Sequence, residues 1–283
     1  MAGKLMRAVQ FEGYGGGAAG LKHVEIPVPS PKKDEVLLKL EATSINPVDW
    51  KIQKGVLRPI LPRKFPYIPG TDVAGEVIEV GPGVTNVKAG DKVVALLSHK
   101  SGGGFAEYAV ASKGLTVETL TDASGIKLDS TGKPTNILIT AASGGVGQYA
   151  VQLAKLGNVH VTATCGSRNI EFIKSLGADE VLDYKTPEGV ALTSPSGCKY
   201  DFVIHCATGI PFSTFEPNLS ANGKGLVPLL MIPKSENLAY LVNLVKEGKL
   251  KTIVDSKHPL SRAEDAWAKS IEGHATGKII VEP

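Results

Sequence analysis

Cysteine is scarce in this chain of 283 residues, which has only Cys165, Cys198 and Cys206. An odd, scattered set argues against a disulfide framework and fits a reducing compartment. Neither the cysteines nor the six histidines show a spacing such as C-x-x-C or H-x-x-x-H. The sequence therefore predicts no metal site.

Long apolar runs and long charged runs are also missing. No stretch reaches the roughly 18 consecutive apolar residues that a membrane span needs, and the first residues contain no apolar block typical of a signal peptide. The net charge of +3 is spread along the chain, so no basic stripe indicates a nucleic-acid partner. Weak attraction to an anionic membrane surface stays open.

What is present is ordinary globular composition, with 42% hydrophobic and 21% charged residues. The length exceeds the roughly 250 residues at which a single core usually stops growing, which favours two domains. Short apolar strands separated by Pro/Gly-rich turns fill the first part of the chain and predict a β-barrel. They are Glu35–Ala42, Val73–Val80, Lys92–Leu97 and Phe105–Val110.

Strands and helices alternate from Asn136 onward, which predicts a parallel sheet with helices on its faces, an α/β Rossmann domain. The expected order is strand Asn136–Thr140, helix Val146–Leu156, strand His160–Cys165, helix Asn169–Leu176, strand Glu180–Tyr184 and strand Tyr200–Cys206. A helix at Glu236–Glu247, a strand at Leu250–Val254, an amphipathic stretch at Arg262–Ile271 and a strand at Lys278–Val281 follow.

A glycine-rich loop joins the first of these strands to its helix. It reads Ala141-Ala-Ser143-Gly144-Gly145-Val146-Gly147, with Ala142 in place of the usual first glycine. Gly144 would let the backbone approach a pyrophosphate, Gly147 would let helix and strand pack closely, and the helix N-terminus would offer free N–H groups. This setting predicts a dinucleotide site.

The end of the second strand distinguishes NAD from NADP, because a carboxylate there binds the ribose 2′-hydroxyl and a cation accommodates the 2′-phosphate. This chain has Gly166, Ser167 and Arg168 there, with no acidic residue. The guanidinium favours NADP(H). The alternative is that Ser167 caps the next helix and Arg168 is a solvated charge.

Four further blocks accompany the loop: Ile45–Lys51, Pro69–Val77, Val87–Val93 and His274–Pro283. With these motifs the chain resembles the quinone oxidoreductase branch of the medium-chain dehydrogenase/reductase superfamily over nearly its whole length. The resemblance implies a GroES-like catalytic domain from residues 1–118 and 248–283, with a Rossmann NADP-binding domain at 119–247 between them.

The resemblance also implies a function: zinc-independent, NADPH-dependent reduction of quinones or of the C=C bond of α,β-unsaturated carbonyls. Without a metal, hydrogen-bond donors would polarise the carbonyl during hydride transfer. It further implies peripheral association with the chloroplast inner envelope, with the cytoplasm as the alternative, and a homodimer if the dimerisation strand is present.

Site residues carry over by position. Asn46, Asp49, Lys51, Thr71 and Asp72 would line the substrate and nicotinamide pocket, while Tyr184, Cys206, Ala207, Lys278 and again Lys51 would contact the cofactor. Each has an alternative: Asn46-Pro47 as a turn, Asp49 as a surface partner of Lys51, Tyr184 as a strand aromatic and Lys278 as a solvated charge on an edge strand.

Two joins depart from the family pattern. Glu118 leads directly into Thr119, where relatives have a helix with a Leu-Pro-x-Ala-Gly-Leu-Thr type motif, and Lys224 and Gly225 lead at once into Leu226, where relatives have a further parallel strand. Losing a central strand would expose apolar area at a cost of roughly several kcal/mol. The alternative function is therefore an NADPH-binding sensor or membrane-associated protein without turnover.

Overall fold

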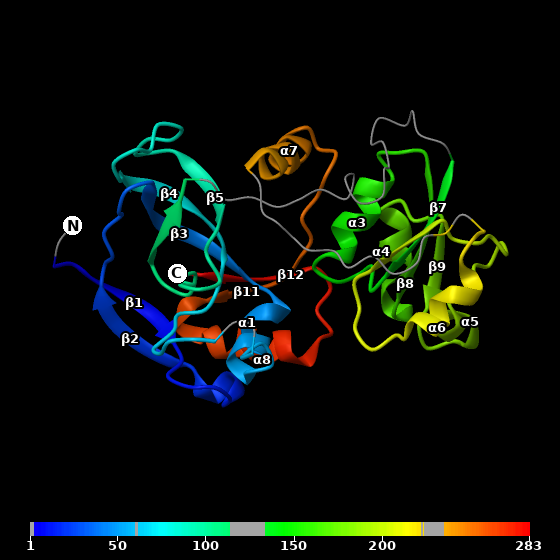
Figure 1. Cartoon of the computed structure of the whole chain (residues 1–283), viewed down its shortest axis with the longest axis horizontal. Helices are drawn as coiled ribbons and strands as arrows, with labels where there is room; N and C mark the ends of the chain where they lie inside the picture. Colours follow the sequence, from blue (N-terminus) through cyan, green and yellow to red (C-terminus); the bar gives the residue numbers. More distant parts are fainter. Residues whose placement is uncertain (1–2, 60–61, 114–133, 222, 224–234) are drawn as a thin grey trace. The chain divides into compact units, whose positions relative to one another are not determined.

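The computed structural model describes residues 3–59, 62–113, 134–221, 223 and 235–283 (Figure 1). The chain divides into two units. The terminal unit combines Met1–Thr116 with Val254–Pro283, and the central unit is Val117–Ile253. Each is described by itself below.

Strands from both ends of the chain build the terminal unit. A hairpin pairs β1 (Leu5–Gln10) with β2 (Lys22–Pro27). A second sheet has the order β11-β12-β3-β4-β5, and β6 also pairs with β3. Its strands are β3 (Glu35–Ile45), β4 (Asp72–Val80), β5 (Lys92–Leu96), β6 (Tyr108–Ser112), β11 (Val254–Pro259) and β12 (Lys278–Glu282). Because β12 pairs antiparallel with β3, the C-terminal residues complete a sheet begun by the N-terminal part.

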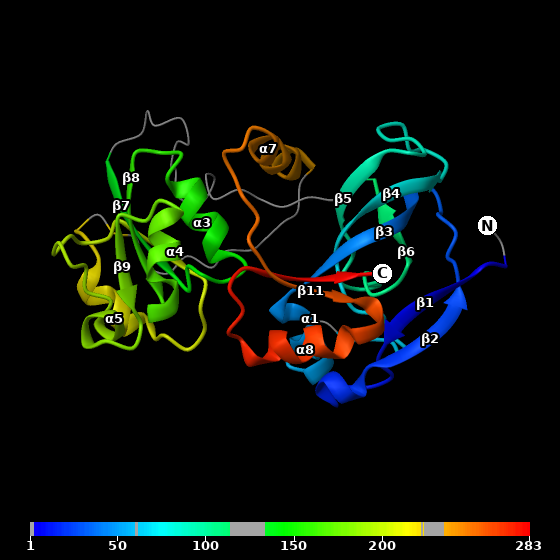
Figure 2. The ribbon, with the colours of Figure 1, turned by 180° about the vertical axis from the view of Figure 1, so that it is seen from behind.

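Two helices of this unit lie side by side, α1 (Pro47–Lys54) and α8 (Ala263–Glu272), as Figures 1 and 2 both show. Trp267 of α8 is fully buried with Phe11 and Phe105 in one core cluster. Its indole Nε1–H donates to Oε1 of the buried Gln53 of α1 at 3.1 Å, so this large aromatic is packed with its polar atom satisfied.

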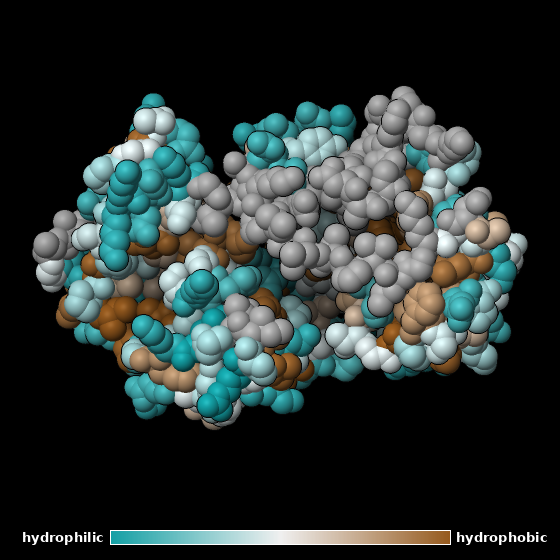
Figure 3. Space-filling model, in the orientation of Figure 1, coloured by the Kyte–Doolittle hydropathy of each residue, from teal (hydrophilic) through white to brown (hydrophobic). Residues whose placement is uncertain are grey.

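The surface over β4 and β5 is mostly hydrophilic (Figure 3). There the Lys92 ammonium pairs with the carboxylates of Glu41 and Glu76. Inward positions of β4, such as Val73 and Val77, are buried while their neighbours are partly exposed. This alternation is the period-two pattern of a half-buried strand.

A parallel sheet of order β10-β7-β8-β9 forms the centre of the central unit. Ile137 and Ile139 of β7 pack on one face, against α3, whereas Leu138 packs on the other face with Leu192 and Phe215. Both faces are thus covered, as parallel sheets require. The elements are β7 (Thr135–Thr140), α3 (Gly147–Ala154), β8 (Val159–Cys165), α4 (Ile170–Ser175), β9 (Glu180–Asp183), α5 (Pro187–Ala191), β10 (Phe202–His205), α6 (Phe212–Phe215) and α7 (Ser235–Lys246).

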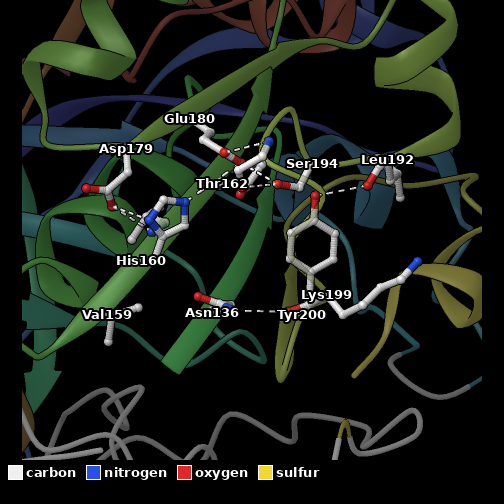
Figure 4. Close-up of polar contacts among 12 residues, drawn as sticks. Asn136, Val159, His160, Thr162, Asp179, Glu180, Leu192, Ser194, Lys199 and Tyr200 are labelled. Carbon is white, nitrogen blue, oxygen red and sulfur yellow. Dashed lines mark hydrogen bonds and ion pairs between the residues drawn. The ribbon is translucent and has the colours of Figure 1, made fainter. Parts of the chain in front are cut away.

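A polar network fixes the amino ends of β8 and β9 (Figure 4). Asp179 accepts hydrogen bonds from the Lys155 ammonium at 2.8 Å and the Val161 N–H at 2.7 Å. Glu180 accepts from the hydroxyls of Thr162 and Ser194 at 3.0 and 2.6 Å. These contacts set the register of the two strands at the end of the sheet remote from the glycine loop.

The expected elements are confirmed in kind, with two corrections. The strand predicted at Leu250–Val254 is wrong, since β11 begins at Val254. The Lys251 and Ile253 N–H groups instead donate to the Gln152 and Gln148 side chains of α3, both at 2.8 Å, so this backbone is tied to a helix. The strand predicted from Phe105 starts only at Tyr108, because the Phe105 N–H is bonded to the Pro69 carbonyl at 2.9 Å. The predictions at Thr119 and at Gly225–Leu226 lie outside the described residues.

Candidate functional site

The glycine loop lies between the carboxyl end of β7 and the start of α3. A Cβ added at Gly147 would stand 2.3 Å from the Ala141 carbonyl oxygen and 2.6 Å from the Ala142 Cα, so only glycine fits there. Ala141 has a positive φ of 49°, and the Ala142 N–H donates to the Thr164 carbonyl of β8 at 2.8 Å. Ser143, Gly144, Gly145 and Val146 then form the turn, and Val146 is 67% exposed. The loop is thus a tight strand-to-helix turn in which Gly147 lets the helix approach the strand closely.

Gly166, Ser167 and Arg168 follow β8 directly. The side chains of Ser167 and Arg168 are exposed. Ser167 is the first residue of a 3-10 turn, Ser167–Asn169, and Asn169 is the residue that precedes α4, so Ser167 does not cap that helix and the capping alternative is wrong. Tyr184 follows β9, and its N–H donates to the Cys165 carbonyl at 3.0 Å. Its ring lies beside Gly166, 3.4 Å from where a Cβ would stand, and Tyr184 is 46% exposed. An aromatic ring and a guanidinium thus lie around the end of β8.

Cys206 and Ala207 follow β10, which lies next to β7. The Cys206 N–H donates to Thr140 Oγ1 at 3.0 Å, and the same hydroxyl lies 2.9 Å from His205 Nδ1. Burial raises the pKa of the Cys206 thiol to about 11, so it stays protonated. His205 was missed by the sequence reasoning. Its place one residue before Cys206, at the strand end, was the signal that could have found it.

A cluster of polar side chains, the Asn46 cluster, gathers in the terminal unit and consists of Asn46, Asp49, Asp72 and Lys278. Lys278, at the start of β12, donates from Nζ to Asn46 Oδ1 at 2.6 Å and lies 3.6 Å from Asp72 Oδ2. Asn46 Nδ2 donates to Asp72 Oδ2 at 2.7 Å. The ammonium is half-buried on a strand with neighbours on both sides, so the edge-strand alternative is wrong.

Asp49 belongs to this cluster through a hydrogen bond with the Asn46 backbone. Its carboxylate oxygens accept the Asn46 N–H at 2.8 Å and the Gly70 N–H at 3.3 Å, and the residue is only 2% exposed. The surface-partner alternative for Asp49 is therefore wrong, and Asn46 is the residue that precedes α1 rather than a free turn. Burial above all, and the negative charge of Asp72, raise the pKa of Asp49 to about 7, against the two backbone hydrogen bonds and Lys278.

The other two predicted pocket residues differ in their surroundings. Thr71 is fully buried before β4, and its Oγ1 has no hydrogen-bond partner within the described residues. Lys51 lies in the last turn of α1 with its ammonium 5.6 Å from the Trp50 ring centroid. The structure thus brings Asn46, Asp49, Asp72 and Lys278 into one network and places Lys51 beside an aromatic ring.

The described ranges contain no cluster of metal ligands and no membrane-spanning helix. No group of three His, Cys, Asp or Glu residues there could hold a metal ion. No helix in the same part of the chain is long and apolar enough to cross a membrane.

Comparison with known proteins identifies the family. Residues 32–121 match the alcohol dehydrogenase GroES-like domain, and residues 145–225 and 212–281 match zinc-binding dehydrogenase families. The chain is 67% identical to the chloroplast envelope quinone oxidoreductase homolog of Arabidopsis thaliana, over the full length of both proteins. It belongs to the quinone oxidoreductase branch of the medium-chain dehydrogenase/reductase superfamily.

Two further relatives fit this assignment. The NADPH-dependent alkenal/one oxidoreductase of Arabidopsis chloroplasts is 32% identical, over 99% of this chain and 80% of that protein. The structure of the quinone oxidoreductase from Coxiella burnetii covers 99% of this chain and all of its own, with 29% identity and a TM-score of 0.86. The predicted Rossmann domain and GroES-like barrel are confirmed, and the chain is an oxidoreductase of a family that binds nicotinamide cofactors.

The alignment with the Arabidopsis quinone oxidoreductase homolog spans 329 positions, although this chain has 283 residues. The relative therefore carries internal residues that this chain lacks. The joins predicted at 118/119 and 224/226 lie outside the described residues. The alignment shows only that this chain is shorter than the relative at internal positions.

Proposed function

We propose that this chain is a zinc-independent, NADPH-dependent reductase of quinones or of the C=C bond of α,β-unsaturated carbonyls. The Asn46 cluster carries the proposal, because it offers amide and ammonium donors beside two carboxylates. All three cysteines of the chain, Cys165, Cys198 and Cys206, belong to the central unit. The terminal unit therefore has no thiolate with which to build a zinc site of the alcohol dehydrogenase type.

Donors of the Asn46 cluster would do the work of a Lewis acid on the substrate carbonyl. Lys278 has three N–H donors, of which one is bonded to Asn46. Asp72 and Asn46 hold the ammonium, and Asp49 holds the Asn46 backbone. A bound nicotinamide supplies the hydride. The preorganised donors would stabilise the negative charge that develops on the carbonyl oxygen.

NADPH is proposed over NADH because Arg168 is exposed directly after β8, at the strand end where the 2′ position of the adenosine ribose is recognised. A guanidinium binds a phosphate in bidentate fashion. Replacing Arg168 by Gln should raise the Kd for NADPH roughly tenfold and leave that for NADH unchanged. Equal effects on both cofactors would remove Arg168 as the selecting residue.

Turnover is tested at 340 nm by following NADPH oxidation with methyl vinyl ketone, a benzoquinone or butanal, and NADP⁺ reduction with ethanol. Rapid oxidation with the first two only, unaffected by EDTA, is expected. Lys278→Met should lower kcat/KM by roughly tenfold to a hundredfold, while Lys257→Met on the neighbouring strand β11, an exposed residue paired with Glu282, should leave it unchanged. No oxidation with any substrate would reject the proposal.

A second candidate is an NADPH-binding sensor or membrane-associated protein without turnover, favoured by the internal residues that the Arabidopsis relative has in addition. It predicts a rise in Tm with NADPH but no oxidation. For either function we propose peripheral association with the chloroplast inner envelope; the name of that relative places that protein at the chloroplast envelope. Release of the protein from isolated envelopes by a carbonate wash is the expected result.

A further inference from the structure

The strand order of the central sheet marks one position at its carboxyl edge. The order β10-β7-β8-β9 means that the chain leaves β7 toward β8 and β9 on one side and returns to β10 on the other. In open parallel sheets, ligands bind outside the carboxyl ends of the strands where this reversal occurs. Here those ends are Thr140 of β7 and His205 of β10, which are paired in register.

Hydrogen bonds fix the protonation of the His205 ring. Thr140 is fully buried, and its Oγ1 accepts the Cys206 N–H at 3.0 Å. The hydroxyl proton then needs an acceptor, because a buried donor without a partner is costly. His205 Nδ1, 2.9 Å away, is that acceptor. We assign the tautomer accordingly, with the proton on Nε2.

The orientation of the ring is also fixed. His205 packs edge-to-face on Phe215, with centroids 5.1 Å apart and an interplanar angle of 67°. Partial burial lowers the pKa of His205, so the imidazole is neutral at pH 7. His205 is exposed. Among the residues that the structure describes, none forms a hydrogen bond with His205 Nε2. A single oriented N–H donor therefore remains at the carboxyl edge between β7 and β10.

We propose that His205 is a cofactor-binding residue, donating its Nε2–H to a pyrophosphate or nicotinamide-ribose oxygen. The inference rests on the proposed function in that it requires a bound nicotinamide dinucleotide. The 2′ position of the adenosine ribose is recognised at the end of β8, so the His205 contact is to atoms that NADPH and NADH share. His205 and Arg168 would thus act on different parts of the same ligand.

The experiment measures Kd for NADPH and NADH by isothermal titration calorimetry, without substrate. His205→Ala should raise both Kd values by the same factor, roughly tenfold. His205→Gln, which retains an amide donor, should stay within about threefold of the wild type. Thr140→Val frees the ring to take the other tautomer and should raise both values roughly threefold. The matched control is His160→Ala, at the opposite end of the same sheet (Figure 4), which should change neither.

Melting temperatures of the variants without ligand separate a folding defect from a lost contact, and His205→Gln tests the contact even if the Ala variant unfolds. The inference is overturned if His205→Ala and His160→Ala behave alike, if His205→Gln is as weak as His205→Ala, or if only NADPH binding suffers. If the wild type binds neither cofactor, the proposed function fails with it. If the wild type binds both and no His205 variant differs, only this inference fails.

Discussion

The glycine loop and the Asn46 cluster hold their geometry by different means. In the glycine loop the constraint is steric: Gly147 is required because any Cβ would overlap the backbone of Ala141 and Ala142. In the Asn46 cluster, side chains hold one another, and the buried Asp49 has a pKa of about 7. A steric constraint does not depend on pH, whereas a network of ionisable groups does.

Gly147→Ala gives the largest expected effect and breaks the steric side of the comparison. The added methyl must displace backbone atoms 2.3 and 2.6 Å away, so we expect a loss of roughly 3–4 kcal/mol of stability. NADPH binding should fall below detection. Chemical denaturation followed by circular dichroism, with hydrogen exchange in α3, measures the effect. A variant as stable as the wild type would show that the loop can relax.

Asp49→Asn tests the ionisable side. The folded pKa of about 7 lies above the ordinary value of 3.8, so between these values the folded state binds more protons and stability falls as pH rises. The slope is about 1.4 kcal/mol per pH unit. The Asn variant lacks this slope: it should match the wild type within about 1 kcal/mol at pH 5 and exceed it by about 2–3 kcal/mol at pH 8.

Both tryptophans, Trp50 and Trp267, lie in the terminal unit, so their fluorescence reports its unfolding directly. Parallel curves of stability against pH for wild type and Asp49→Asn would contradict the raised pKa. Asp91→Asn is the control, because Asp91 also accepts a backbone N–H, from Lys88 at 2.9 Å, but in an exposed turn.

The sequence predicts the glycine loop more directly than it predicts the Asn46 cluster. The glycine loop is local in the chain, so a strand, three glycines and a helix start sufficed to place it. The Asn46 cluster joins residues more than 200 positions apart, since Lys278 bonds to Asn46, and only the family resemblance suggested it. Burial of Asp49 and the Thr140–His205 bond could not be read from the sequence, because the first depends on how α1 packs in the terminal unit and the second on the pairing of β7 with β10. The Leu250–Val254 prediction failed because Gln148 and Gln152 offered that backbone side-chain partners.

Asp179→Asn tests a second network of ionisable groups, this one in the central unit at the end of the sheet remote from the glycine loop. Burial opposes ionisation, but the Lys155 ammonium and the Val161 N–H together hold the pKa of Asp179 below its ordinary 3.8. Its contribution is therefore present above pH 4 and is lost as the pH falls further. We expect a loss of about 1 kcal/mol at pH 7 and a smaller loss at pH 3, measured by urea denaturation. Equal losses at both pH values would reduce Asp179 to a packing role. NADPH affinity should not change.

Gly144→Ala gives the smallest expected effect on folding and separates the two uses of glycine in the loop. Its Cβ would meet only the Ala141 carbonyl oxygen, at 3.2 Å, a contact that a shift of a few tenths of an ångström relieves. Stability should therefore fall by about 0.5 kcal/mol or less. If Gly144 serves to let a pyrophosphate approach the backbone, NADPH affinity should nevertheless fall roughly tenfold, as calorimetry would show. An Ala variant with unchanged affinity would mean that other residues of the loop contact the cofactor. The glycine pattern of the loop would then reflect only the close packing required at Gly147.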